Sequence, residues 1–184
     1  MKFEDKVVIV TGVGSGIGAA TAARFLSEGA KVTLISRHQA DLKETAKGFH
    51  PDNFLIQKAD VSDEKQVKIV IAEILKKFGQ IDVLVNNAGI AVMGKVTEIN
   101  TAAWRQQMAT NIDGVFFFTR AAMPYLIQSG RCIVNTVSLS RLGGNENMIA
   151  YNTTKGAIVN FTRCTAIDYG REGVRINSVC PSYT

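Results

Sequence analysis

Residues Lys6 to Gly18 read KVVIVTGVGSGIG, a short apolar run that passes directly into a glycine-rich loop. The run has the β-branched composition of a buried strand, and a helical pattern follows over residues 17–27. The glycines allow a tight turn, and they let a pyrophosphate approach main-chain N–H groups at the N-terminus of the helix. The stretch therefore predicts a strand, turn and helix that bind a dinucleotide. A glycine cluster alone also fits a simple tight turn.

The same alternation of strand and helix continues along the chain. Strands are expected at Lys6–Thr11, Lys31–Ile35, Phe54–Lys58, Asp82–Asn86, Arg131–Val137 and Val174–Val179. Helices are expected at residues 17–27, 40–47, 63–78, 102–128 and 150–169, the third of them capped by Ser62. The strands are almost continuously apolar, as expected when helices cover both faces of a sheet. Right-handed crossovers then give a doubly wound parallel α/β sheet with ligands at the carboxyl ends of its strands.

Length and composition exclude several classes of protein. The 184 residues predict a single domain, 1–184, and 46% hydrophobic with 20% charged residues excludes a disordered chain. The formal net charge of +5 comes from scattered residues, so we expect no nucleic-acid partner. Three cysteines without a CxxC pair argue against a disulfide framework and a metal site, and they fit the cytoplasm. No apolar run reaches the 18 or so residues of a membrane span, so a membrane partner is not expected.

Tyr151 and Lys155 carry a chemical signal of their own. They are four residues apart in an expected helix, so they lie on one face, one turn apart. A nearby ammonium group favours the ionised form of a phenol, whose reference pKa is about 10. The pair therefore predicts a proton donor or acceptor, although a lone pair with this spacing also fits an ordinary exposed helix face.

Three motifs together resemble the short-chain dehydrogenase/reductase family. They are TGVGSGIG at residues 11–18, NNAG at 86–89, and YNTTK at 151–155 with Ser138 before it. The resemblance covers nearly the whole chain. It implies a Rossmann-type doubly wound sheet in a single domain. It also implies reversible hydride transfer between a nicotinamide dinucleotide and a carbonyl or secondary alcohol of a small substrate.

The resemblance implies the catalytic set Asn111, Ser138, Tyr151 and Lys155. In this set Tyr151 transfers the proton and Ser138 orients the substrate. Lys155 assists Tyr151 and binds the nicotinamide ribose, and Asn111 holds a water that relays protons to Lys155. Ser140 is the alternative to Ser138, but the family spacing favours Ser138. On the sequence alone, Asn111 also fits a buried polar residue or a helix kink.

The resemblance also implies a set of cofactor-binding residues: Gly12, Ser15, Gly16, Ile17, Gly18, Ser36, Arg37, Asp60, Val61, Asn87, Ala88, Gly89, Tyr151, Lys155 and Pro181. In nucleotide-binding folds an acidic residue after the second strand accepts from the ribose 2′-OH and selects NAD. Ser36 occupies that place, and the Arg37 that follows can hold a 2′-phosphate. We therefore expect NADP(H), with NAD(H) as the alternative, because Arg37 could instead cover the adenine or face solvent. Asp60 is expected to contact the adenine amino group or to cap the next helix.

Other expectations concern substrate, assembly and chain length. The segment from residue 131 to 182 is most similar to bacterial acetoin reductases and 2,3-butanediol dehydrogenases of this family. Apolar side chains on the expected helices 102–128 and 150–169 favour a homodimer or homotetramer. Their helical spacing alone is equally compatible with burial in the hydrophobic core of a single chain. The family continues beyond Thr184 with a substrate-covering loop, a helix and a strand, so we expect that the C-terminal strand and cap are missing from this chain. A nucleotide-binding regulator without turnover and an inactive fragment are the alternative functions.

Overall fold

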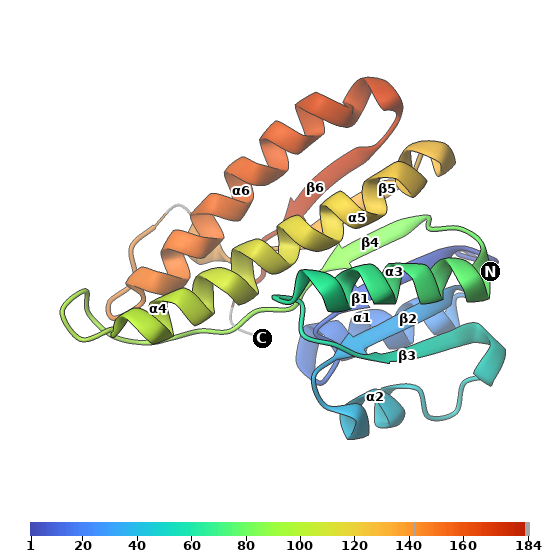
Figure 1. The fold of residues 1–184 in the computed structure, drawn as a ribbon, viewed down its shortest axis with the longest axis horizontal. Coiled ribbons are helices and arrows are strands. Elements are labelled where there is room, and N and C mark those ends of the chain that lie inside the picture. Colours follow the sequence, from blue (N-terminus) through green and yellow to red (C-terminus); the bar gives the residue numbers. More distant parts are fainter. Residues whose placement is uncertain (142, 183–184) are drawn as a thin grey trace.

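The computed structural model describes residues 1–141 and 143–182. Its six parallel strands form one sheet in the order β3-β2-β1-β4-β5-β6 (Figure 1). The strands are β1 (Val7–Thr11), β2 (Lys31–Ser36), β3 (Phe54–Lys58), β4 (Val83–Asn86), β5 (Cys132–Thr136) and β6 (Arg175–Val179). All six lie where the apolar runs predict them. The expected doubly wound α/β sheet is therefore confirmed.

Six α-helices connect the strands and cover the sheet. They are α1 (Gly16–Ser27), α2 (Gln39–Thr45), α3 (Glu64–Phe78), α4 (Thr101–Met108), α5 (Gly114–Ser129) and α6 (Ile149–Tyr169). Because the strand order runs outward from β1 to β3 and then returns to β4, right-handed crossovers place α1 and α2 on one face and α3, α5 and α6 on the other. Figure 1 shows α3 and α5 in front of the strands and α6 alongside β6.

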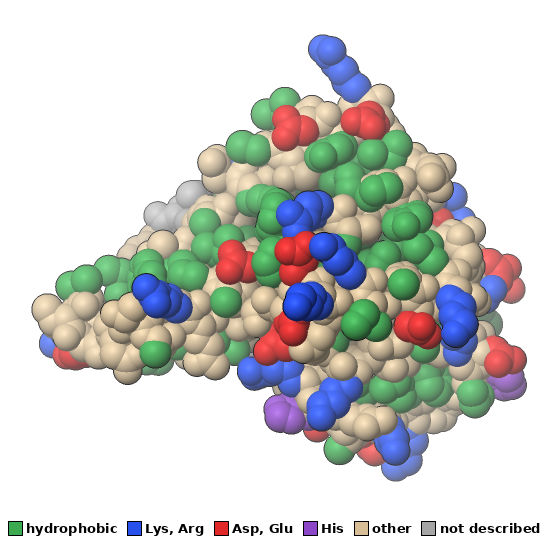
Figure 2. All heavy atoms as spheres, in the orientation of Figure 1, with side chains coloured by type: hydrophobic (Ala, Val, Ile, Leu, Met, Phe, Trp, Pro, Cys, Tyr) green, Lys and Arg blue, Asp and Glu red, His purple; other side chains and the backbone are tan. Residues whose placement is uncertain are grey.

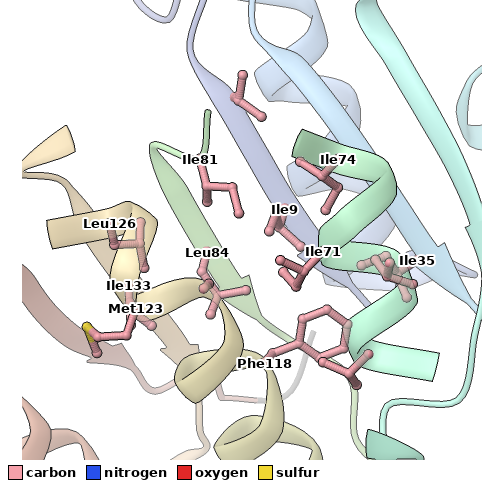
Figure 3. Close-up of a cluster of buried hydrophobic side chains, with 14 of the residues drawn as sticks. Ile9, Ile35, Ile71, Ile74, Ile81, Leu84, Phe118, Met123, Leu126 and Ile133 are labelled. Atoms are coloured by element: carbon pink, nitrogen blue, oxygen red, sulfur yellow. The ribbon is translucent and has the colours of Figure 1, made fainter. Parts of the chain in front are cut away.

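The two faces of the central strands bury different residues. Ile9 and Leu84 point toward α3 and α5, where they pack against Ile71 and the fully buried Phe118 (Figure 3). The alternate residues of β1, beginning with Val8, pack in a second cluster with α1 and α2. Apolar side chains on both faces explain why these strands lack the polar alternation of a half-exposed sheet.

Two local details differ from the sequence prediction. The helix expected over residues 102–128 is interrupted by a π-helical segment, Ala109–Asp113, between α4 and α5. Helix α3 is capped by Asp63 and not by Ser62, because the Asp63 carboxylate accepts the N–H groups of Lys65 and Gln66. The Ser62 hydroxyl instead donates to Asp60 at 2.6 Å.

No helix of the described residues is long and apolar enough to cross a membrane. Within residues 1–141 and 143–182, no group of three or more His, Cys, Asp or Glu side chains could hold a metal ion. The expectation that a further strand and cap follow Thr184 stays a prediction.

Candidate active site

The strand order reverses between β1 and β4, and their carboxyl ends open a cleft there. The Thr11 hydroxyl at the end of β1 accepts the N–H groups of Asn87 and Ala88, both at 3.0 Å. The Asn87 amide donates in return to the carbonyl oxygens of Thr11 and Gly12, both at 3.1 Å. These bonds hold the loop after β4 against the glycine loop, so both walls of the cleft are fixed before any ligand binds.

The glycine loop fits the phosphates of a dinucleotide. Gly12 has φ +70°, and a Cβ there would lie 2.7 Å from Ala88 Cα, so only glycine allows this approach. A Cβ at Gly16 would meet nothing within 4 Å, which leaves that backbone open. Ser15 caps α1 without a side-chain hydrogen bond, and the first turn of α1 contains no acidic residue. Unblocked amides at a helix N-terminus are suited to an anion.

A cleft of about 480 Å³ runs from this loop across the carboxyl ends of β2 and β3. Eight of the expected cofactor residues line it: Gly12, Ser15, Ser36, Arg37, Asp60, Val61, Ala88 and Gly89. Its ionisable lining side chains are Arg37, His38, Asp41 and Asp60. The size of the cleft and its loop therefore suit a nucleotide.

A second pocket, of about 320 Å³, contains the expected reactive side chains. It is lined by Ser138, Tyr151 and Lys155, and the expected cofactor residues Ile17, Asn87, Gly89 and Pro181 line it too. Gly89 and Ile90 line both this pocket and the nucleotide cleft, so the two are adjacent. A molecule in the cleft can therefore extend to the reactive side chains.

Lys155 is buried beside Tyr151. Its ammonium group donates to the carbonyl oxygen of Thr136 at 2.9 Å and lies 5.5 Å from the centre of the Tyr151 ring. Burial lowers the pKa of Lys155 from 10.5 to about 8, and the neighbouring Cys180 side chain acts less strongly in the opposite direction. Lys155 therefore remains mostly charged at neutral pH in a largely enclosed position.

Asn111 lies in the π-helical segment, 3% exposed, and lines neither pocket. Its side-chain oxygen accepts from the Ile90 N–H at 2.8 Å, and its amide donates to the Ile90 carbonyl at 2.9 Å and to the Thr154 hydroxyl at 3.0 Å. The side chain of Asn111 thus connects the loop after β4 to α6 beside Lys155. Both alternative interpretations of Asn111 from the sequence agree with the structure, since its side chain is fully hydrogen-bonded and it lies at an irregularity of the helix.

Comparison with known proteins agrees with this geometry. The family model of the short chain dehydrogenases matches residues 6–184. The chain belongs to the short-chain dehydrogenase family. A meso-2,3-butanediol dehydrogenase of Serratia marcescens is 44% identical over 182 residues, which are 99% of this chain and 72% of the relative. A 2-(R)-hydroxypropyl-CoM dehydrogenase of Xanthobacter autotrophicus is 40% identical over 96% of this chain and 74% of its own.

Solved structures of short-chain dehydrogenases share the fold. A 3-ketoacyl-(acyl-carrier-protein) reductase from Brucella melitensis, complexed with NADH, superposes with a TM-score of 0.93 at 32% identity, over 97% of this chain and 76% of that one. A short-chain dehydrogenase/reductase from Caenorhabditis elegans, with cofactor, has a TM-score of 0.92 at 35% identity, over 98% and 70% of the two chains. This chain is therefore an oxidoreductase of a family that acts on alcohols and ketones with a nicotinamide cofactor.

The structure of this short-chain dehydrogenase also places residues that sequence reasoning missed or misplaced. The cleft has seven further lining residues, Gly14, Ile35, His38, Asp41, Ala59, Ile90 and Thr110. Gly16 and Gly18 line neither pocket, and a Cβ at Gly18 would overlap the Gly12 carbonyl oxygen, so the packing of the loop requires glycine there. Cofactor binding by Gly16 and Gly18 stays a prediction. Asp60 does not cap α3, because its carboxylate accepts from Ser62 while Asp63 is the cap.

Proposed function

We propose that the protein catalyses reversible hydride transfer between a nicotinamide dinucleotide and a small secondary alcohol or ketone, with Tyr151 as general acid and base. The observation that carries the proposal is the shared pocket of Ser138, Tyr151 and Lys155 next to the nucleotide cleft. When bound, the dinucleotide supplies or accepts the hydride. The protein contributes binding, orientation and proton transfer.

In the direction of ketone reduction, the Tyr151 hydroxyl gives its proton to the carbonyl oxygen as negative charge develops there. The Ser138 hydroxyl donates a hydrogen bond to the same oxygen and so fixes the carbonyl in place. The Lys155 ammonium, held by the Thr136 carbonyl, stabilises the phenolate left on Tyr151. In alcohol oxidation the phenolate takes the proton back. Asn111 acts from behind this pocket by holding Ile90 and α6 together and by supporting a water that relays protons to Lys155.

The test is Tyr151→Phe, which removes one oxygen from a half-buried ring. We expect cofactor affinity to change less than about threefold and kcat to fall by about 10²-fold or more, the usual contribution of general acid catalysis. Tyr169→Phe at the end of α6 is the matched control, because Tyr169 lines neither pocket. Near-normal turnover in Tyr151→Phe would refute the role of the phenol.

The substrate side of the pocket favours a small uncharged substrate. The adjoining cavity of about 440 Å³ shares Ser138 and Tyr151 with the reactive pocket, and it is also lined by Leu139, Asn145 and Met148. No described residue that lines it is charged. We propose a small neutral ketone, diketone or diol, as the name of the Serratia marcescens relative suggests. Steady-state rates against diketones, simple ketones, sugars and a sulfonated ketone test this, and a preference for the sulfonate would contradict it.

For the cofactor we propose NADP(H) as the preferred form, with NAD(H) also accepted. Arg37 lines the cleft directly after Ser36, where it can pair with a 2′-phosphate. Arg37→Ala is expected to lower kcat/KM for NADPH about tenfold and to leave kcat/KM for NADH within about twofold, as loss of one charge-assisted contact implies. Equal losses with both cofactors would show that Arg37 does not contact the phosphate.

We further propose a homodimer or homotetramer that pairs through α5 and α6. Hydrophobic side chains gather over these two helices on the face shown in Figure 2, and Phe116 and Ile167 are 40% and 79% exposed. The free state of Cys132, Cys164 and Cys180 supports a reducing location such as the cytoplasm. Light scattering with Ile167→Glu tests the assembly, and an unchanged oligomer in that variant would place the interface elsewhere.

A further inference from the structure

We propose that Asp41 is a specificity-determining residue of the nucleotide cleft: its carboxylate weakens the preference for NADP(H) and supports use of NAD(H). This inference rests on the proposed function, because it concerns the same cofactor site. Asp41 stands in the first turn of α2, five residues beyond the position where an acidic selector of NAD is expected. The carboxylate therefore enters the cleft from a helix and not from the end of β2.

The glycine loop, β2 and α2 converge at this point. A Cβ built on Gly14 would lie 3.0 Å from Asp41 Oδ2 and 3.2 Å from Ser36 Oγ, so both side chains border the same glycine. Gly14, Ser36 and Asp41 all line the nucleotide cleft. Asp41 is half-buried, whereas the Arg37 and His38 side chains are exposed. The carboxylate is thus seated at the end of the cleft where the position after β2 contacts the ribose.

The backbone that carries Asp41 is held in place. The Thr45 hydroxyl is 3.1 Å from the carbonyl oxygens of both Asp41 and Val13 and can donate to either one, which fastens α2 to the glycine loop. Leu42, the next residue, is fully buried against β1 and β2. These contacts hold the backbone of α2 against the glycine loop and the sheet, and so place the Asp41 carboxylate at the cleft.

The charge of Asp41 is not neutralised within the protein. Across residues 1–141 and 143–182, no Lys, Arg or His nitrogen forms an ion pair within 4.0 Å of its carboxylate. The other ionisable side chains of the cleft are Arg37, His38 and Asp60. Among the described lining residues Arg37 is therefore the one permanent positive charge, and of the two carboxylates, Asp41 and Asp60, it is Asp41 that borders Gly14 together with Ser36, where a 2′-phosphate is expected.

The two cofactors place different groups beside this carboxylate. The ribose 2′-OH of NAD(H) is a donor, and a carboxylate is a strong acceptor for it. The 2′-phosphate of NADP(H) carries about 1.5 to 2 negative charges, which a carboxylate repels. Arg37 attracts the phosphate and Asp41 opposes it, so the two residues work against each other. The site therefore discriminates less strongly between NADP(H) and NAD(H) than it would with Arg37 alone.

The test compares Asp41→Asn with the wild type by calorimetric titration of NADP⁺, NAD⁺, 2′,5′-ADP and 5′-ADP in low-salt buffer. We expect the affinity ratio of NADP⁺ to NAD⁺ to rise about tenfold, or about 1.4 kcal/mol, and the ratio of 2′,5′-ADP to 5′-ADP to rise in parallel. The gain should shrink at high salt, because the repulsion is electrostatic. Glu44→Gln is the matched control, since it removes one negative charge from the exposed side of α2.

The outcomes separate this inference from the proposed function. If the ratios change less than twofold in Asp41→Asn, or change equally in Glu44→Gln, the role of Asp41 is refuted, while binding of both dinucleotides to the wild type still supports the nucleotide cleft. If neither dinucleotide binds the wild type, the proposed function itself fails. Unfolding midpoints of both variants establish that each is folded.

Discussion

Replacing Lys155 by Met should change how the stability of the protein depends on pH. Lys155 is 7% exposed, and burial lowers its pKa from 10.5 to about 8. In the unfolded chain the same amine titrates near 10.4. Between the two pKa values the unfolded chain binds one more proton than the folded chain, so the free energy of unfolding rises with pH across this window.

The magnitude follows from the shift. Integration from pH 7 to pH 9 gives a gain of about 1 kcal/mol in the free energy of unfolding from this one group. At pH 7 the buried charge costs about 3 kcal/mol, and the hydrogen bond to the Thr136 carbonyl returns about 1 kcal/mol. Lys155→Met, which gives an unbranched, uncharged side chain one heavy atom shorter, should therefore be more stable than the wild type by about 2 kcal/mol at pH 7.

Urea unfolding at pH 7 and pH 9, without dinucleotide, measures both quantities. The advantage of Lys155→Met should shrink by about 1 kcal/mol at pH 9. Lys76→Met on α3 is the control. Because Lys76 is exposed, its replacement should change the free energy of unfolding by the same amount at pH 7 and at pH 9. A variant that is less stable than the wild type at pH 7, with a gap independent of pH, would show that Lys155 is not a strained buried charge.

Three further substitutions test the framework of the fold. Gly12→Ala should destabilise the fold by about 2 kcal/mol or more, because its Cβ would lie 2.7 Å from Ala88 Cα. Gly16→Ala, which has a similar φ but open space around the new Cβ, should cost only about 1 kcal/mol. Equal losses of stability for the two variants in chemical denaturation would contradict the packing argument. Asp82→Ala should lower the free energy of unfolding by about 3 kcal/mol, because the buried carboxylate accepts from the Val7 N–H at 2.9 Å and pairs with two cations, Lys6 and Arg131. A loss below about 0.5 kcal/mol in urea unfolding would mean that water takes the place of the carboxylate.

The fold could be predicted from local pattern because the central strands β1, β2 and β4 are buried on both faces and therefore appear as continuous apolar runs. The run at Phe54–Lys58 was predicted with its exact bounds, and the strand Val7–Thr11 differs from the prediction by one residue. Helix starts were harder, since two neighbouring polar residues compete for a cap. Ser62 and Asp63 both fit the pattern, and the contact of Ser62 with Asp60 leaves the cap to Asp63.

The candidate catalytic residues could be predicted where they are separated by short, fixed distances in the sequence. The four-residue step from Tyr151 to Lys155 and the position of Ser138 after β5 are local, and the structure brings all three to one pocket. Asp41 was missed because its role depends on how α2 is placed against the glycine loop. The expected position of the acidic residue at the end of β2 leads to Ser36 and Arg37. No local sequence pattern shows that a carboxylate from the following helix, α2, also lines the cleft.

Asn111 illustrates why the rest of the site needs tertiary structure. An Asn in the middle of an apolar helix is costly unless its amide is satisfied, and the π-helical segment frees it from the regular helical face. Its side chain satisfies both main-chain groups of Ile90 and also reaches Thr154, whose hydroxyl donates to the Tyr151 carbonyl. One side chain thereby fixes the distance between the loop that lines both pockets and the helix that carries Tyr151. Thr11 fixes the other end of that loop through the N–H groups of Asn87 and Ala88. The path from nucleotide cleft to reactive pocket is therefore set by Thr11 and Asn111, which line neither of the two.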